Sequence, residues 1–588
     1  MNEIYFPEEN RLGKRTILLT FFFFLWFFGL TLRLIELQVI EHSRLKAAVL
    51  KQNQLKPEIN PERGTIYDRS GKIMARSLPV FSAFFLPSDE EPFEQQFARV
   101  RQVRKILELS DKELQNIRIK MEEGAPFIWV KRKISPEKAE FVRRLNLSGI
   151  DFQEEHKRSY PLGALAAHVL GGVNIDDKGA GGVEFQHNSR LQGEKGQSLI
   201  LRDARKRPYH LEVLKEPTPG QDLVLTIDET IQYIAERELA KAVEASGAAG
   251  GTVIVSQPSS GEILAMASYP TYDPNFYPPS SPEAERNRAI QFNFEPGSTF
   301  KIITAVAARE LELVGFNEIF DCSSGRIRVA GWTIYDYKKM GVLTFSDVII
   351  HSSNVGTIQV SYHIGPENLF KMINKFRFGQ KTGIELPGEE NGILHPLKAW
   401  TRTSLPAHAI GYEISVTAIQ ILQAMNVIAN RGCLVPPRIT RERPDPAGLI
   451  EASASPFERI IAEKTANSLI DRIFEKVVLD GTGQAAQLNG YTVAGKTGTA
   501  QKIDPATGNY MATRHVASFV GFVPVEKPVI SMIVVIDDPR TDLHYGGQVA
   551  APVFREIASR ILLYLRQPPS IDPAKKVVTA QLKRESER

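Results

Sequence analysis

Residues 294–301 of the chain read FEPGSTFK and lead directly into the apolar run 302–308, IITAVAA. The Pro-Gly pair is typical of a turn, and the apolar run after Ser298 predicts a buried helix that ends near Val314. Ser298 would lie at the helix N-terminus, where free N–H groups and the helix dipole favour developing negative charge. Lys301 follows three residues later, so a helix returns its amine to the face of the Ser298 hydroxyl. A serine beside a lysine that burial keeps neutral predicts the reactive centre of an acyl-transfer enzyme.

The length and composition of the chain limit the possible protein classes. Its 588 residues exceed what one hydrophobic core accommodates, so we expect two or three folded units. The net charge of +4 is small for this length and gives no support for a nucleic-acid partner. Cys322 and Cys433 lie far apart without CxxC spacing, which predicts no zinc site and leaves a disulfide between them undecided.

The N-terminus carries a candidate membrane anchor. Residues 1–15 are polar and end in basic side chains, and residues 16–33 are predominantly apolar, near the lower length limit for crossing a bilayer. A cleaved signal peptide is the alternative, but no small-residue cleavage site follows and the helical pattern continues to Ile40. We therefore expect an uncleaved single-pass anchor. The basic residues before it predict a cytoplasmic tail at 1–15, with the rest of the chain outside the cytoplasmic membrane.

The region between the anchor and the Pro-Thr-Pro-Gly linker at 217–220 lacks a catalytic set of residues. Residues 34–219 mix short strands, charged helices and turns. Within them, residues 63–71 predict a strand that leads into a tight turn at Ser70-Gly71. We expect an elongated, mixed α/β non-catalytic module of the pedestal or dimerisation type.

Residues 220–566 predict an α+β domain. A strand at 223–226 precedes a helix capped by Asp228. The remaining expected elements are a hairpin of strands 252–255 and 263–266, helices between 298 and about 430, strands at 491–494, 517–522 and 530–536, and a last helix at 551–565. Strands at both ends of the domain predict one antiparallel sheet closed by its terminal strands, with a helical lobe against it. The Pro- and charge-rich tail, residues 567–588, predicts disorder.

A second polar motif, Ser352-Ser353-Asn354, lies between two apolar helical patterns. Ser352 is placed to relay a proton between the lysine and a leaving amine, and Asn354 to hold a substrate amide or Lys301. A helix cap or turn is the alternative interpretation of such a cluster.

The third motif is Lys496-Thr497-Gly498-Thr499, which follows an apolar strand pattern. A strand edge with one lysine and two threonine hydroxyls can bind a carboxylate, and Gly498 would let a substrate approach the backbone. A second Lys-Thr-Gly at 381–383 lies in a loop bounded by glycine and proline, so we interpret that copy as structural.

The order S-x-x-K, S-x-N, K-T-G resembles the penicillin-binding proteins and class A β-lactamases. The leading anchor and the segments 63–71, 181–184 and 545–554 are similar to class B penicillin-binding proteins, over nearly the whole chain to about Phe554. Residues 286–288, 294–301 and 352–356 resemble the division-specific group of that class. One departure is Gly411-Tyr412-Glu413, where the family usually has a glycine after the aromatic residue, and we assign it no role.

The resemblance implies a D,D-transpeptidase that cross-links peptidoglycan stem peptides. Ser298 would attack the D-Ala-D-Ala carbonyl and expel the terminal D-Ala, with Lys301 as base. Ser352 would shuttle the proton, and Asn354 would orient the substrate. An amine of a neighbouring stem peptide would then take the acyl group, and β-lactams would trap the serine.

The resemblance also assigns the K-T-G segment. Lys496, Thr497 and Thr499, with Gly498 between them, would bind the terminal carboxylate. The backbone N–H groups of Ser298 and Thr499 would form the oxyanion hole. The implied partners are inner-membrane division proteins and a glycosyltransferase. No metal or organic cofactor is implied.

Three alternatives remain at this stage. A β-lactamase shares the motifs, but the retained anchor, the long N-terminal module and the lack of an evident glutamate motif for deacylation oppose it. An elongation-type class B enzyme is the second alternative. Only the resemblance of the motif segments favours the division type over it. A membrane-anchored scaffold with weak or no catalysis is the non-enzymatic alternative, which the intact motifs oppose.

Overall fold

The computed structural model of the chain describes residues 9–46, 54–55, 58–88, 91–202, 208–279, 281–441, 457–504, 506–541 and 543–571. These residues pack into two compact units. Unit 1 comprises residues 1–62, 79–155 and 193–219, and unit 2 comprises residues 63–78, 156–192 and 220–588. The expected boundary near residue 219 is therefore one of several points at which the chain passes between units. Residues 572–588, most of the tail for which we expected disorder, lie outside the described residues.

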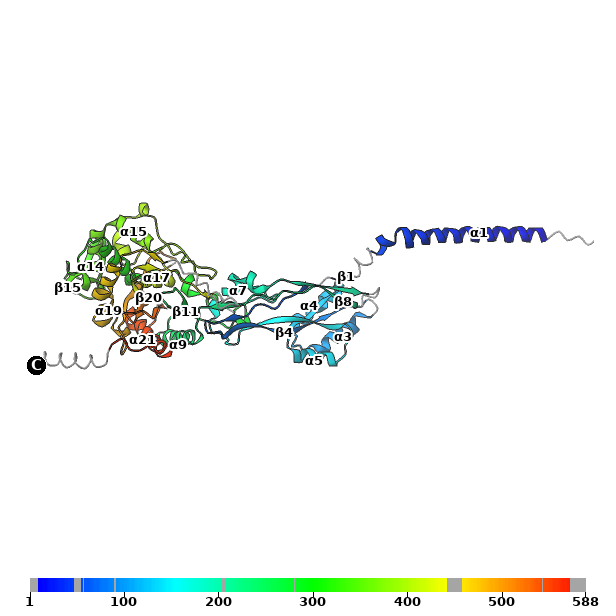
Figure 1. Ribbon diagram of the computed structural model, residues 1–588, viewed down its shortest axis with the longest axis horizontal. Helices are drawn as coiled ribbons and strands as arrows, with labels where there is room; N and C mark the ends of the chain where they lie inside the picture. Colours follow the sequence, from blue (N-terminus) through cyan, green and yellow to red (C-terminus); the bar gives the residue numbers. More distant parts are fainter. Residues whose placement is uncertain are drawn as a thin grey trace, which may run out of the picture. The chain divides into compact units, whose positions relative to one another are not determined.

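The N-terminal helix is the one helix in the described residues that is long and apolar enough to cross a membrane. It consists of α1 (Glu9–Ile35), drawn in blue in Figure 1, and a π-helical turn, η1 (Glu36–Ile40). The candidate span runs from Arg15 to Ile40, with a mean hydropathy of 2.0 and no buried surface. It extends beyond the expected 16–33 because the helix continues past Arg33.

Unit 1 has its own hydrophobic core. Its elements are β1 (Gln54–Leu55), β2 (Glu58–Ile59), α3 (Phe93–Val103), α4 (Asp111–Glu122), β5 (Ile128–Ile134), α5 (Pro136–Arg144), β7 (Gly196–Arg202) and β8 (Pro208–Lys215), with parts of β4 (Ile73–Phe85) and β6 (Ile150–Ser159). The three helices lie beside β4 in Figure 1. Phe85 on β4 shares the core with Phe97 and Val100 of α3. The mixed α/β character expected for this module is confirmed.

Two segments that precede residue 220 belong to unit 2, and a buried charge cluster joins them. The Glu184 carboxylate, fully buried, accepts hydrogen bonds from the Arg63 Nε and the Arg158 Nε, both at 2.6 Å. The Tyr160 hydroxyl donates to the same carboxylate at 3.3 Å. Two buried guanidinium groups therefore depend on one carboxylate for their neutralisation.

Replacing Glu184 with glutamine is expected to lower the free energy of unfolding by about 3–5 kcal/mol, because two buried cations lose their counter-charge. The matched control is Glu458→Gln, which breaks an exposed ion pair with Arg377 and should cost at most about 1 kcal/mol. Urea-induced unfolding of the purified variants measures both. Equal midpoints for the two variants would contradict the assignment of Glu184 as a structural centre.

The part of unit 2 that follows residue 220 is built on a five-stranded sheet. Its strand order is β11-β10-β21-β20-β19, and all neighbouring strands are antiparallel. The strands are β10 (Gly250–Ser256), β11 (Ile263–Tyr269), β19 (Ala494–Ile503), β20 (Tyr510–Val523) and β21 (Ile530–Asp537). The hairpin from the start of the domain pairs with the strands from its end. This confirms the predicted α+β fold and its closure by terminal strands.

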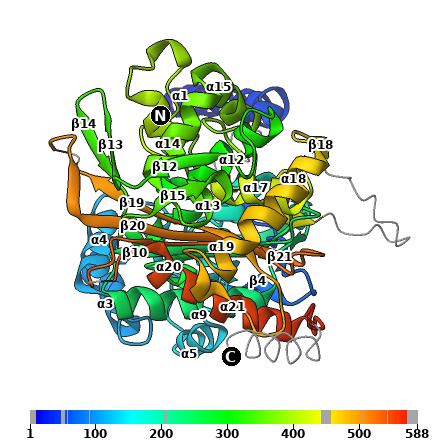
Figure 2. The ribbon, with the colours of Figure 1, turned by 90° about the vertical axis from the view of Figure 1, so that its left-hand side faces the viewer.

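Helices cover both faces of this sheet (Figure 2). On one face, α9 (Glu229–Ser246) and α21 (Ala551–Tyr564) pack on side chains such as Val253 and Val255. On the other, α12 (Lys301–Glu310) and α17 (Ala418–Ala429) share a core with Ile254. The alternation of neighbouring residues between the two cores follows from the two-residue period of a strand.

The rest of unit 2 comprises short elements. Before the sheet come β3 (Ile66–Tyr67), α6 (Ala167–Leu170), α7 (Gly182–Gln186), α8 (Asn188–Gln192) and β9 (Leu223–Leu225). The helical lobe and its hairpins comprise α10 (Pro282–Glu285), α11 (Arg288–Gln291), β12 (Ile319–Cys322), β13 (Arg326–Val329), β14 (Trp332–Tyr335), β15 (Gly341–Thr344), α13 (Phe345–Ile350), α14 (Asn354–Ile364), α15 (Pro366–Lys375), α16 (Ser404–Ala409), α18 (Glu463–Leu469) and α19 (Glu475–Leu479). The short helix α20 (Gly546–Val549) packs instead against β20 and α21.

Two predicted boundaries were wrong. The helix after the serine ends at Glu310 and not near Val314, because Glu312 adopts a left-handed conformation with a φ of 52°. The strand expected at 491–494 begins only at Ala494, since Tyr491 lies in an isolated bridge with Leu488. Asp228 caps α9 as predicted, its carboxylate accepting from the backbone of Thr230.

Candidate active site

Ser298 lies in a 3₁₀ turn, η3 (Gly297–Phe300), immediately before α12. Gly297 has a φ of 52°, and a Cβ there would lie 2.5 Å from the carbonyl oxygen of Thr499 on β19. The Gly297 N–H also donates to the Gly411 carbonyl at 3.0 Å. Only glycine fits between these neighbours. The turn is thereby held against the edge of the sheet, with Ser298 lining an open cleft.

The Lys301 side chain is fully buried beneath this turn. Its amine donates to the Ser352 carbonyl at 2.8 Å, to the Ser352 hydroxyl at 3.3 Å and to the Asn354 side-chain oxygen at 2.9 Å. Burial lowers the pKa of Lys301 to about 7, although the Asp336 carboxylate opposes this shift. A large fraction of the amine is therefore neutral near pH 7 and able to accept a proton.

The Ser298 hydroxyl has no hydrogen-bond partner among the described residues. The amine of Lys301, three residues after Ser298 in the chain, instead donates to Ser352 and Asn354. Hydrogen bonds between a nucleophile and its base are often absent or long before a substrate binds. The structure therefore places Ser298 and its candidate base Lys301 at one site, without a hydrogen bond between the hydroxyl and the amine.

Ser352 and Asn354 both face the buried lysines, whereas Ser353 has a structural role. Ser353 is the N-cap of α14, and its hydroxyl accepts from the Gly356 N–H at 2.9 Å. Ser352 adopts a left-handed φ of 61°. This conformation is costly for a non-glycine residue and common at functional sites. The helix-cap interpretation therefore applies to Ser353, and its two neighbours are free for chemistry.

The third motif lies on β19, the edge strand of the sheet. The Lys496 amine is fully buried and donates to the Ser352 hydroxyl at 3.0 Å. Burial, and then the neighbouring Lys301, lowers the pKa of Lys496 far below its usual range. Ser352 thus lies between two lysine amines, which can pass a proton along a chain of hydrogen bonds.

The threonines of the motif line the cleft together with Gly498. The Thr497 hydroxyl bonds the Thr482 hydroxyl at 2.6 Å, and the Thr499 hydroxyl accepts from the Gly546 N–H at 3.0 Å. A Cβ on Gly498 would lie 2.7 Å from the Thr299 side chain. Glycine at 498 therefore allows the turn that carries Ser298 to pack against β19.

The second Lys-Thr-Gly, at 381–383, lies in a loop away from this cleft. Thr382 is buried, and its N–H and hydroxyl both donate to the Glu389 carboxylate, at 2.7 and 2.5 Å. The polar groups of Thr382 are therefore bound within the loop, which is consistent with a structural role for this copy.

The cleft has a volume of about 780 Å³. Besides the motif residues it is lined by side chains from segments compared with the family, namely Tyr412, Tyr545 and Gln548. It is also lined by side chains that the sequence did not single out: Tyr335, Asp336, Tyr337, Thr482, Gln484, Gln501, His515 and His544. In the described chain, no group of three or more His, Cys, Asp or Glu residues is arranged to hold a metal ion. Cys322 and Cys433 are free thiols.

Asp336 supports the second motif from the loop after β14. Its carboxylate accepts from the Ser353 hydroxyl at 2.8 Å and from the backbone N–H groups of Asn354 and Val355. No local sequence pattern pointed to it, since its partners lie 17–19 residues further along the chain.

Replacing Asp336 with asparagine is expected to move the acid limb of the acylation profile below pH 7. The carboxylate raises the pKa of Lys301, so removing its charge lowers that pKa further. The pH dependence of acylation by benzylpenicillin measures the shift. Asp321→Asn, which changes an exposed carboxylate on β12, is the control. A midpoint that stays in place or moves upward would contradict this electrostatic coupling.

Glu413, the position that departs from the family pattern, adopts a left-handed φ of 57°, where glycine would be relaxed. Its carboxylate accepts from the Ser404 hydroxyl at 2.7 Å and the Thr403 hydroxyl at 3.1 Å. Its N–H donates to Glu295, whose pKa burial raises to about 7. These bonds hold the neighbouring Tyr412 at the wall of the cleft.

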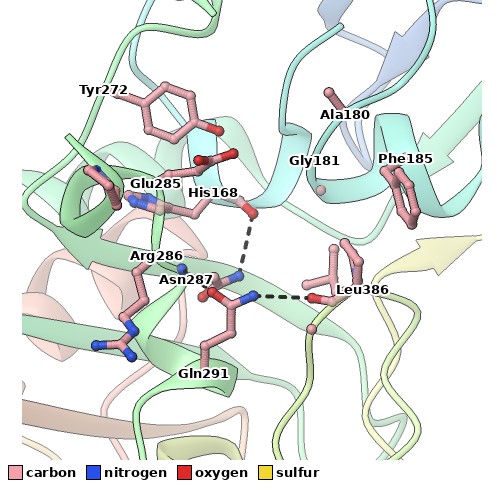
Figure 3. A pocket seen from close by; sticks show the side chains of 14 residues that line it. His168, Ala180, Gly181, Phe185, Tyr272, Glu285, Arg286, Asn287, Gln291 and Leu386 are labelled. Carbon is pink, nitrogen blue, oxygen red and sulfur yellow. Dashed lines mark hydrogen bonds between the residues drawn. The ribbon is translucent and has the colours of Figure 1, made fainter. Parts of the chain in front are cut away.

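A second cavity of about 460 Å³ lies elsewhere in unit 2 (Figure 3). Among its lining residues, Asn287 donates to the His168 carbonyl at 3.4 Å and Gln291 to the Pro387 carbonyl at 3.5 Å. Burial lowers the pKa of His168 to about 4, so this imidazole is neutral. No residue of the three motifs lines this cavity. Its lining residues come from the segment 156–192 and from residues 272–388 of the same unit.

Comparison with known families agrees with this geometry. The model for the penicillin-binding protein transpeptidase domain matches residues 251–559, more than half of the chain. The model for the penicillin-binding protein dimerisation domain matches residues 58–225. The chain therefore belongs to the class B penicillin-binding proteins and is an enzyme of the transpeptidase type.

Individual relatives cover nearly the whole chain. Stage V sporulation protein D of Bacillus subtilis is 34% identical over 92% of this chain and 84% of its own length. The peptidoglycan D,D-transpeptidase FtsI of Escherichia coli is 30% identical over 90% of this chain and 88% of its own. Penicillin-binding protein 3 of Mycobacterium tuberculosis matches with a TM-score of 0.66 and 28% identity, over 88% of this chain and 98% of that structure. The same relative has been solved in complex with aztreonam.

Proposed function

We propose that this chain is a peptidoglycan D,D-transpeptidase that works through a covalent acyl-enzyme on Ser298. The observation that carries the proposal is that Ser298 and Ser352 line one cleft. The buried amines of Lys301 and Lys496 both donate hydrogen bonds to the Ser352 hydroxyl. The relatives named D,D-transpeptidases support the choice of peptidoglycan as substrate. β-Lactams are then inhibitors because they acylate the same serine.

In the first half-reaction, the Ser298 oxygen attacks the penultimate D-Ala carbonyl and the neutral Lys301 amine accepts the hydroxyl proton. The peptide bond to the terminal D-Ala breaks, and its nitrogen receives a proton through Ser352. Asn354 orients the substrate and holds the Lys301 amine. In the second half-reaction, an amine of another stem peptide attacks the ester, forms the cross-link and releases Ser298.

The edge strand β19 provides the remaining groups. The Ser298 and Thr499 N–H groups stabilise the oxyanion of the tetrahedral intermediate. Lys496, Thr497 and Thr499 bind the terminal carboxylate of the donor peptide, with Gly498 keeping the nucleophile turn at the strand.

We assign the enzyme to septal wall synthesis at the cytoplasmic membrane. The basic residues before the anchor favour a cytoplasmic N-terminus and an outward-facing catalytic domain. Similarity to FtsI and the division-type motifs support a septal role, with inner-membrane division proteins and a glycosyltransferase as partners. An elongation-type role is the second candidate.

Depletion of the protein in growing cells tests the septal assignment. Loss of a septal enzyme should give filaments, because elongation continues while cross-walls fail. Rounded cells would instead support the elongation role. Complementation with the wild type, but not with Ser298→Ala, would separate catalysis from a scaffolding function.

A further inference from the structure

Three arginine side chains of unit 2 converge on one buried carboxylate, that of Glu262. Arg69 lies in the turn after β3, and Arg438 and Arg441 lie at β17 (Thr440–Arg441). The Glu262 oxygens lie 3.4 Å from the guanidinium of Arg69, 3.1 Å from that of Arg438 and 3.2 Å from that of Arg441. We call Arg69, Arg438 and Arg441 the arginine triad.

The arginine triad carries more positive charge than its surroundings neutralise. Among the described residues, Glu262 is the one carboxylate that pairs with the triad, so three guanidinium groups share a single negative charge. Asp68 and Glu385 are neighbouring carboxylates, but backbone N–H groups bind them and neither forms an ion pair with the triad in the described chain. The triad therefore keeps an excess of positive charge.

The side chains of the triad are partly buried. They keep 23%, 31% and 37% of their surface exposed, against 5% for Glu262. The Nε of Arg438 is buried and has no hydrogen-bond partner in the part of the chain that the structure describes. Guanidinium groups in this position have lost part of their hydration and repel one another. Both effects strengthen the binding of a further carboxylate, compared with arginines that project into water.

The triad lies away from the catalytic cleft. Glu262 directly precedes β11, which is one end of the strand order of the five-stranded sheet, and β19 is the other end. No residue of the triad lines the cleft of Ser298. A molecule that binds the triad therefore does not have to enter the cleft, and binding and acylation can occur together.

We propose that the arginine triad is a docking site for an acidic segment of a partner protein, one that presents two neighbouring aspartate or glutamate side chains. The carboxylates complement the excess charge, and planar guanidinium groups bind carboxylates through paired N–H donors. Because the triad is partly recessed, a carboxylate on a narrow chain reaches it more readily than the flat surface of a bilayer does. Two carboxylates on one segment also bind more tightly than two separate anions, since the second contact is intramolecular.

The test measures binding of a fluorescein-labelled peptide of alternating aspartate and glutamate to the full-length protein in detergent, by fluorescence anisotropy. The wild type should bind the peptide saturably. Arg438→Gln/Arg441→Gln should raise the Kd about threefold to thirtyfold, because two of the three ion pairs with the peptide are lost. This variant should acylate with benzylpenicillin at the wild-type rate, which establishes that it is folded.

The matched control is Arg377→Gln/Arg459→Gln, which removes the same charge from exposed ion pairs with Glu458 and Glu463. It should keep the wild-type Kd. Glu262→Gln gives a test of the opposite sign: it removes the carboxylate that competes for the triad, so the folded variant should bind the peptide more tightly than the wild type.

Four outcomes would overturn the docking site. They are the absence of saturable binding by the wild type, an unchanged Kd in folded Arg438→Gln/Arg441→Gln, an equal loss of affinity in the control, and weaker binding by folded Glu262→Gln. Displacement of the peptide by inorganic phosphate at an equal concentration would identify a site for small anions, and would also overturn docking of a protein segment.

Discussion

Ser298→Ala is expected to lose covalent labelling by fluorescent penicillin completely, a decrease on the order of at least 10³-fold in acylation rate. The alanine removes the hydroxyl that we assign to the attack on the β-lactam carbonyl, while the proposed oxyanion hole and carboxylate site stay in place. In-gel fluorescence of the purified protein after brief incubation measures the loss.

The matched control is Ser468→Ala on α18, a half-buried serine whose hydroxyl donates to the Lys464 carbonyl of its own helix. It should label like the wild type. Thermal unfolding should show that Ser298→Ala is folded, since Ser298 is only partly buried and its hydroxyl has no partner in the described residues. Persistent labelling of a folded Ser298→Ala would remove Ser298 as nucleophile.

Lys301→Met is expected to slow acylation by about 10²–10⁴-fold, because the cleft loses its general base. In the wild type, acylation should rise with pH and reach half its maximum near pH 7, where the buried amine loses its proton. Below that point the rate should fall about tenfold per pH unit. Stopped-flow or quenched acylation with benzylpenicillin gives both the rates and the profile.

The stability of Lys301→Met separates loss of chemistry from loss of fold. The pKa of Lys301 is lower in the folded than in the unfolded protein, so between pH 7 and about pH 10 the unfolded state binds more protons and stability rises with pH. Methionine removes this penalty and should unfold at the same temperature as the wild type or higher. Lys464→Met, at an exposed position on α18, is the control. An unchanged acylation rate in Lys301→Met would exclude Lys301 as the base.

The local patterns in the sequence predicted much of the catalytic fold. The short apolar runs bounded by turn residues predicted the strands of the sheet, because a sheet covered on both faces needs apolar side chains on both. The cap at Asp228 predicted the start of α9. The spacing of Ser298 and Lys301 predicted their shared location because a helical turn is a local constraint. The three motifs proved to line one cleft only once the sheet and the lobe were assembled.

The contacts that sequence reasoning missed are long-range. Asp336 supports Asn354 from a separate hairpin, and His515 meets His544 across the gap between β20 and a later loop. The sequence also did not predict how the chain divides into units. Arg63 belongs to unit 2, where it binds Glu184, and Glu184 lies 121 residues further along the chain. No periodicity or spacing encodes such partners.

The most direct test of the central claim is to map the residue that benzylpenicillin acylates in the wild-type protein. Tryptic cleavage after Arg288 and Lys301 releases residues 289–301, AIQFNFEPGSTFK, in which Ser298 is the only serine. The proposed mechanism predicts that this peptide alone gains the mass of the opened β-lactam, with fragmentation placing it on Ser298. An adduct on Ser352 or on any other residue, or no adduct on the folded protein, would contradict it.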